Sequence, residues 1–133
     1  MTAPRGLLDT SVYIATESGR GLDESNLPDE GALSVVTLAE LRAGVLAAVD
    51  TGVRARRLAT LEAASTVKAF GIDAAVAGEW ARLRVHLAET GRRVGVNDLW
   101  IAATAVAHRL PVVSQDGDFD ALVGAEGFTL IRV

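Results

Sequence analysis

The chain has 133 residues, half of them hydrophobic, which fits one domain with a sizeable buried core. The absence of cysteine excludes a disulfide framework and any thiolate metal site, and it favours a reducing compartment. A net charge of −4 and a pI of about 5.1 argue against a protein that binds nucleic acid through overall positive charge alone. No apolar run approaches the roughly 20 residues that span a bilayer, and the N-terminus lacks a signal-peptide apolar stretch. We therefore expect a cytoplasmic protein without a membrane segment.

The first half of the chain predicts alternating strands and helices. The expected elements are a strand over residues 5–9, a helix over 11–18, a loop over 21–31, a strand over 32–36, and helices over 37–49 and about 53–65. Gly19 ends the first helix, and Gly52 separates the last two. Thr37 followed three residues later by Glu40 is a capping-box pattern, which predicts a helix start at Thr37.

The second half continues this alternation. The expected elements are a short strand over 66–70, a helix capped by Asp73, a loop over 90–96, a helix over 98–109 capped by Asn97, a strand over 111–114, a helical turn over 118–124 and a strand over 128–133. Interleaved strands and helices favour parallel pairing with helices on both faces. With no linker, repeat or low-complexity tract, we predict a single α/β domain over residues 1–133, with three α/β/α layers and a mostly parallel central sheet.

Four acidic residues stand where apolar segments end or helices begin: Asp9, Glu40, Asp98 and Asp116. In a parallel α/β sheet these positions share one edge, so the four side chains should meet. Two carboxylates about 5 Å apart repel by roughly 3 kcal/mol at an effective dielectric near 20, so such a cluster needs protons or a metal. Oxygen ligands alone suit Mg²⁺ or Mn²⁺.

Each acid also has an ordinary structural explanation. Asp9 and Asp116 occur where turn residues are common. Glu40 fits a cap partner worth about 1 kcal/mol, and Asp98 complements a helix dipole by roughly 0.3–1 kcal/mol. These explanations are as good as the functional one for each residue alone. They do not explain why all four fall at the same edge of the sheet.

The segments "LLDTSVYIA", "SVVTLAELRAG" and "NDLWIAATAVAHRLPVVSQDGDF" resemble the PIN-domain family, and more narrowly the VapC toxins of bacterial toxin–antitoxin pairs. The likeness covers essentially the whole chain. It places the family's acidic quartet on Asp9, Glu40, Asp98 and Asp116, with Asp118 as an additional acid. The side chains expected beside the quartet are Thr10, Ser11, Asn97, Ser114 and Asp118.

The resemblance implies an endoribonuclease toxin that hydrolyses phosphodiester bonds of RNA with Mg²⁺, or Mn²⁺ in its place. We expect Asp9, Asp98 and Asp116 to hold metal, and Glu40 to ligate it or to orient the attacking water. The implied partners are an RNA substrate, a VapB-type antitoxin and a second copy of the chain, with no direct DNA binding unless the antitoxin is present.

The basic residues are 12 arginines and one lysine, and guanidinium is the better bidentate phosphate ligand. Arg20, Arg92 and Arg93 lie in loops near the expected site and are candidate RNA contacts, although a solvated role fits each of them as well. Both tryptophans, Trp80 and Trp100, match helical core spacing better than base stacking.

The first two helices carry more apolar residues than one sheet face can cover, which is typical of a surface that receives a partner helix. These residues are Tyr13, Ile14, Leu38, Leu41, Val45, Leu46 and Val49.

Two other functional classes do not fit this sequence, and a third stays open. A receiver-type phosphoacceptor needs a lysine at the acidic edge, and the only lysine, Lys68, precedes a strand end without an acid. A dinucleotide-binding module needs a glycine-rich turn after the first strand, and "LLDTSV" has none. A catalytically silent PIN-fold module that binds RNA or protein stays open as the alternative, because fold does not establish function.

Overall fold

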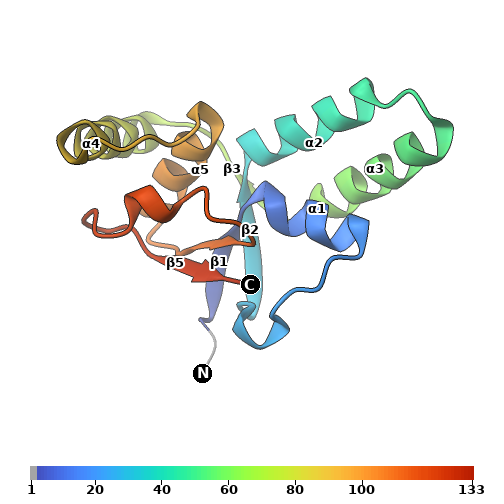
Figure 1. Ribbon diagram of the computed structural model, residues 1–133, viewed down its shortest axis with the longest axis horizontal. Coiled ribbons are helices and arrows are strands. Elements are labelled where there is room, and N and C mark those ends of the chain that lie inside the picture. The colour runs from blue at the N-terminus through green and yellow to red at the C-terminus, as the bar shows by residue number, and fades with distance from the viewer. Residues whose placement is uncertain (1–2) are drawn as a thin grey trace.

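The computed structural model describes residues 3–133, which form a parallel sheet covered by helices (Figure 1). The strands are β1 (Arg5–Leu8), β2 (Glu30–Ser34), β3 (Lys68–Phe70), β4 (Val112–Ser114) and β5 (Leu130–Arg132). The α-helices are α1 (Thr10–Ser18), α2 (Val35–Ala47), α3 (Thr51–Ala64), α4 (Ala74–Thr90) and α5 (Val96–Ala107). Two short 3-10 helices, η1 (Glu24–Asn26) and η2 (Asp120–Leu122), lie in connecting segments.

The strand order is β3-β2-β1-β4-β5, and every neighbouring pair is parallel. Leu7 of β1 aligns with Ala32 of β2 on one side and with Val112 of β4 on the other. The chain moves outward from β1 to β3 and then returns to the other side of β1 as β4. The carboxyl ends of β1 and β4 therefore form a topological switch point, where ligand sites of open α/β sheets occur.

Alternate residues of the central strands belong to cores on opposite faces, as the period of a strand requires. Leu7, Ala32 and Val112 belong to the core formed with α4 and α5. Leu33 belongs to a core with α2 and α3, and Val113 packs with α1 on that same face. These cores establish the predicted three α/β/α layers, with a sheet that is parallel throughout.

Helices α2 and α3 form a hairpin that projects from the carboxyl end of the sheet (Figure 1). Leu41 of α2 packs on Leu61 of α3, and Arg57 Nη1 donates a 2.8 Å hydrogen bond to the Gly44 carbonyl oxygen. The predicted apolar surplus is real in part, because Leu46 is 76% exposed at the end of the hairpin. Leu41, however, is buried, so it is not a surplus residue.

The predicted start of α2 was wrong. Strand β2 ends at Ser34, whose hydroxyl accepts a 3.1 Å hydrogen bond from the Val36 amide and caps the helix. Thr37 therefore lies inside the first turn of α2, and the capping box with Glu40 does not form. A serine with two β-branched residues after it resembles the end of a strand in sequence, which hid this cap.

Two other helix starts also differ from the prediction. Helix α3 begins at Thr51, because Asp50 caps it by accepting a 2.9 Å hydrogen bond from the Val53 amide. Gly52 thus lies in the helix rather than before it. Helix α5 begins at Val96 with Gly95 at the N-cap, so Asn97 is not its cap. The predicted Asp73 cap of α4 is confirmed by its 3.0 Å bond from the Val76 amide.

None of the helices in residues 3–133 is both long enough and apolar enough to cross a membrane.

Candidate active site

The four predicted acids are brought to one open pocket of about 240 Å³ at the switch point. Asp9 follows β1, Glu40 lies on α2, Asp98 lies in the first turn of α5, and Asp116 follows β4. The pocket is lined by Asp9, Thr10, Ser11, Ile14, Arg20, Glu40, Asp98, Asp116 and Asp118. The expectation that acids from separate segments would meet at this edge is thus met by the geometry.

Asp9 is held by a hydroxyl network between the two central strands. Its side chain accepts hydrogen bonds from the Ser11 amide at 3.4 Å and from Ser114 Oγ at 3.1 Å. Ser114 is fully buried, and its hydroxyl also lies 3.3 Å from Asp116 Oδ1. The single Ser114 proton can serve only one carboxylate at a time, so this serine links Asp9 to Asp116 without neutralising either.

Glu40 is held by α1. Thr10 Oγ1 donates a 2.7 Å hydrogen bond to Glu40 Oε1 and lies 3.0 Å from the buried Thr37 hydroxyl. Because Thr10 directly follows Asp9, the strand end that places the first acid also orients the second. Thr37 thus belongs to this hydroxyl network and is not a helix cap. Its three-residue spacing from Glu40 had predicted the cap instead.

The acids of the pocket are close enough to influence one another's ionisation. Burial, and then the negative charges of Asp9, Asp118, Glu40 and Asp116 in that order, raise the pKa of Asp98 from 3.8 to about 7. A carboxylate influenced by four others is half protonated near neutral pH unless a cation compensates the charge.

Two other acids in the pocket have raised pKa values. Burial raises the pKa of Asp9, and the charge of Asp116 adds to this, while hydrogen bonds from Ser11 and Ser114 oppose it. Loss of solvation and the charge of Asp116 raise the pKa of Asp118. Asp118 is exposed and donates its amide to Asp116 Oδ1 at 3.1 Å, so it orients that carboxylate from outside.

The donor set of the pocket suits a hard divalent cation, since it offers carboxylate and hydroxyl oxygens and neither nitrogen nor sulfur from histidine or cysteine. Within residues 3–133, no three His, Asp or Glu side chains are gathered tightly enough to enclose one ion. The carboxylates would therefore have to move closer together to enclose a cation. Without a cation, their mutual repulsion keeps them apart.

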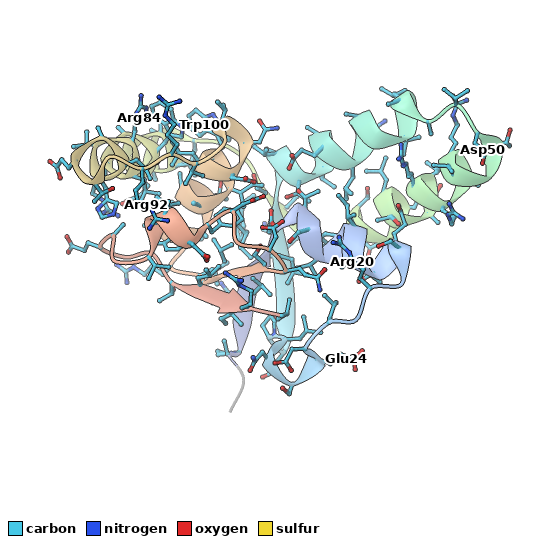
Figure 2. The ribbon with its side chains drawn as sticks, viewed as in Figure 1. Arg20, Glu24, Asp50, Arg84, Arg92 and Trp100 are labelled. Carbon is cyan, nitrogen blue, oxygen red and sulfur yellow. The ribbon has the colours of Figure 1, made fainter. Side chains whose placement is uncertain are left out.

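The predicted RNA contacts fall in two places. Arg20 lines the acidic pocket and is the one cationic side chain among the lining residues of that pocket. Arg92 and Arg93 line a different, larger pocket beside α4, together with Arg84, which the sequence reasoning missed. Arg84 follows Trp80 by four residues, so the helical spacing could have placed it on that face. Figure 2 shows Arg20 at α1 and both Arg84 and Arg92 on the α4 side.

Other side chains considered from the sequence do not line the acidic pocket. Asn97 is exposed in the first turn of α5 and is absent from the pocket lining. Trp80 and Trp100 stack on each other with ring centres 5.1 Å apart and pack against the α4–α5 core, as expected of packing residues.

Comparison with known proteins gives consistent matches. Residues 6–124 match the PIN domain model. Ribonuclease VapC5 of Mycobacterium tuberculosis is 60% identical over 132 residues, which cover 99% of this chain and 98% of that protein. Ribonuclease VapC4 of the same organism is 44% identical over 130 residues, which cover 98% and 100% of the two chains.

A solved structure agrees with these matches. The crystal structure of VapBC-5 from Mycobacterium tuberculosis, described as a member of the VapBC family of toxin-antitoxin systems, superposes with a TM-score of 0.92 at 56% identity. The superposition covers 98% of this chain and 99% of that one. The chain belongs to the PIN-domain family and, within it, to the VapC ribonucleases.

Proposed function

We propose that this protein is a Mg²⁺- or Mn²⁺-dependent endoribonuclease, the toxin of a toxin–antitoxin pair. The observation that carries the proposal is that Asp9, Glu40, Asp98 and Asp116, which come from four separate segments, line one pocket. The near full-length likeness to proteins named ribonucleases supports RNA as the substrate.

In this proposal Asp9, Asp98 and Asp116 hold the cation, and Glu40 orients the attacking water. A bound divalent ion supplies charge stabilisation and an acidified water for phosphodiester hydrolysis. Glu40 suits a positioning role because the Thr10 hydroxyl fixes its Oε1 at 2.7 Å, which leaves the other carboxylate oxygen able to accept a proton. Ser114 keeps Asp9 and Asp116 in place on adjacent chain segments.

The proposed antitoxin site is a groove of about 210 Å³ between α1, α2 and α3, lined by Ile14, Glu17, Glu40, Leu41, Gly44 and Arg57. Ile14 and Glu40 line both this groove and the acidic pocket. An amphipathic partner helix could cover Ile14, which is 44% exposed, and could extend a cationic side chain to the acids. Inhibition would then combine steric blockade with competition against the metal ion.

The nuclease proposal is tested with purified protein and a mixed pool of RNA. We expect cleavage in Mg²⁺ or Mn²⁺ that leaves 3′-hydroxyl ends, that stops when metal is chelated, and that falls by roughly 10²-fold or more in Asp98→Asn. Glu62→Gln, which changes the charge equally on an exposed face of α3, is the matched control and should cleave normally. Mg²⁺ should also raise the melting temperature of the wild type. An RNA-binding chain that neither cleaves nor responds to metal would instead be a catalytically silent module.

The antitoxin proposal is tested with two synthetic helical peptides that differ in one arginine, which is changed to alanine in the second peptide. Excess Mg²⁺ should partly relieve inhibition by the arginine peptide and leave inhibition by the alanine peptide unchanged. Equal inhibition at all Mg²⁺ concentrations would leave steric blockade alone. We also propose that the protein is a homodimer, which light scattering would show as twice the mass of one chain. We propose that it does not bind DNA without the antitoxin, so a DNA shift assay with the protein alone should show no shift.

A further inference from the structure

A pocket of about 580 Å³ lies beside the acidic site and has the opposite charge. We call it the arginine pocket, and it is lined by Trp80, Arg84, Leu87, Ala88, Gly91, Arg92, Arg93, Val94, Val96 and Leu99. Its lining contains three guanidinium groups and no carboxylate. This concentration of positive charge stands out in a chain with a net charge of −4.

The three arginines of this pocket are electrostatically uncompensated. Two arginines outside the pocket are paired with acids, since Arg82 pairs with Glu79 at 2.6 Å and Arg132 pairs with Asp120 at 2.5 Å. Arginines without an acidic partner also occur elsewhere, but here three of them line one cavity. Within residues 3–133, Arg84, Arg92 and Arg93 make no ion pair and no side-chain hydrogen bond. Fixed charges left without a partner around a cavity attract an anion of matching geometry, and guanidinium binds phosphate bidentately.

The arginine pocket and the acidic pocket share one element. Val96 and Leu99 of the first turn of α5 line the arginine pocket, whereas Asp98 between them lines the acidic pocket. The two pockets thus lie on either side of a single helical turn, and a helix with its side chains is about 10 Å across. The carboxylates of the acidic pocket repel a polyanion such as RNA, and the adjacent arginines offset that repulsion.

We propose that the arginine pocket binds the phosphate backbone of single-stranded RNA next to the bond that is cleaved. The proposal rests on the nuclease function proposed above and assigns Arg84, Arg92 and Arg93 to substrate binding rather than to chemistry. A second copy of the chain is the less suitable occupant. A symmetric interface centred here would oppose two sets of like charges.

The protein carries its own reporter for this pocket. Its only two tryptophans are Trp80, which lines the pocket, and Trp100, which stacks on Trp80. Figure 2 shows Trp100 on the same side of the molecule as Arg84. RNA that enters the pocket should therefore change the intrinsic tryptophan fluorescence, and this signal needs neither metal nor cleavage.

The test titrates a single-stranded oligoribonucleotide into the whole protein in EDTA at several salt concentrations, following tryptophan fluorescence and labelled-RNA anisotropy. The double variant Arg92→Gln/Arg93→Gln should bind about 10-fold or more weakly at low salt. The slope of log affinity against log salt should fall by about 1.4, which is about 0.7 for each lost phosphate contact. Arg5→Gln/Arg56→Gln removes the same charge from exposed sites outside the pocket and should behave like wild type.

Equal affinities and salt slopes for the two double variants would overturn the proposal. A shift of the monomer–dimer equilibrium in the pocket variant, with RNA binding unchanged, would overturn it in favour of a second copy. The nuclease function is judged separately by cleavage in Mg²⁺. Binding lost in the pocket variant, with a wild type that cleaves no RNA, would retain this site and reject the nuclease. Cleavage with an unchanged KM in the pocket variant would retain the nuclease and reject this site.

Discussion

Replacing Asp98 by asparagine should stabilise the metal-free protein above neutral pH while it abolishes cleavage. Burial and four neighbouring carboxylates raise the pKa of Asp98 from 3.8 to about 7. A raised carboxyl pKa contributes stability that is complete below pH 3.8 and is lost as the pH rises through about 7. The metal-free wild type should thus weaken between about pH 4 and pH 7, and the asparagine variant should lack most of this loss.

The size of the effect follows from the shift. A change of about 3 units at 1.36 kcal/mol per unit gives about 4 kcal/mol as an upper bound. Because Asp98 is only partly buried, solvent screening reduces this to about 2 kcal/mol. Loss of a charge at the start of α5 removes up to about 1 kcal/mol of helix-dipole stabilisation. The variant should therefore gain about 1–2 kcal/mol, or roughly 4–8 °C in melting temperature at pH 8.

Thermal melts in EDTA at pH 5 and pH 8 measure this difference. The gain should be present at pH 8, small at pH 5, and reversed when Mg²⁺ is added, because the wild type alone then binds metal at full strength. Glu62→Gln makes the same change in charge on an exposed surface and should show no such pH dependence. If Asp98→Asn melts well below wild type at pH 8 in EDTA, the carboxylate is a structural element and the repulsion argument fails.

Three other substitutions test single contacts. Thr10→Val removes the hydroxyl that fixes Glu40 and should lower kcat by about 10-fold or more, with less effect on metal binding. Thr10→Ser keeps the hydroxyl and should retain the wild-type rate. Single-turnover cleavage measures the rate, and calorimetry measures metal binding. Ser114→Ala leaves Asp9 without its 3.1 Å donor and should weaken Mg²⁺ binding, measured by titration calorimetry. Asp73→Ala removes the cap of α4 and should cost about 1 kcal/mol in urea unfolding without changing cleavage.

The fold was predictable because apolar periodicity and turn residues specify strands and helices locally. Gly19 ends α1 with a backbone φ of 75°, a conformation that glycine adopts without strain. The errors concern helix starts, where several residues in a row can serve as the cap. Ser34 rather than Thr37 caps α2, because Ser34 is the last residue of β2 that pairs with β3. Strand pairing depends on the neighbouring strands rather than on local sequence.

The acidic pocket was predictable for a different reason. Parallel topology alone brings the ends of β1 and β4 together, so the positions of Asp9 and Asp116 in the sequence were sufficient. The hydroxyl contacts between Thr10 and Glu40 and between Ser114 and Asp9 depend on side-chain directions, which spacing does not specify. Arg84 was missed because a helical arginine carries no motif, and only the packing of α4 beside α5 places it in the arginine pocket.

The balance of energies at Asp98 decides between its structural and functional explanations. Gly95, not Asp98, occupies the N-cap of α5, and within residues 3–133 the Asp98 carboxylate has no hydrogen-bond donor. The helix dipole contributes at most about 1 kcal/mol, which is less than the roughly 2 kcal/mol that burial and the neighbouring negative charges add to the cost of ionising Asp98. An aspartate kept only for structure would therefore be improved by asparagine. A carboxylate at this position has a net cost in the metal-free protein. A bound cation would compensate that cost, so the residue fits a cation site better than a purely structural role.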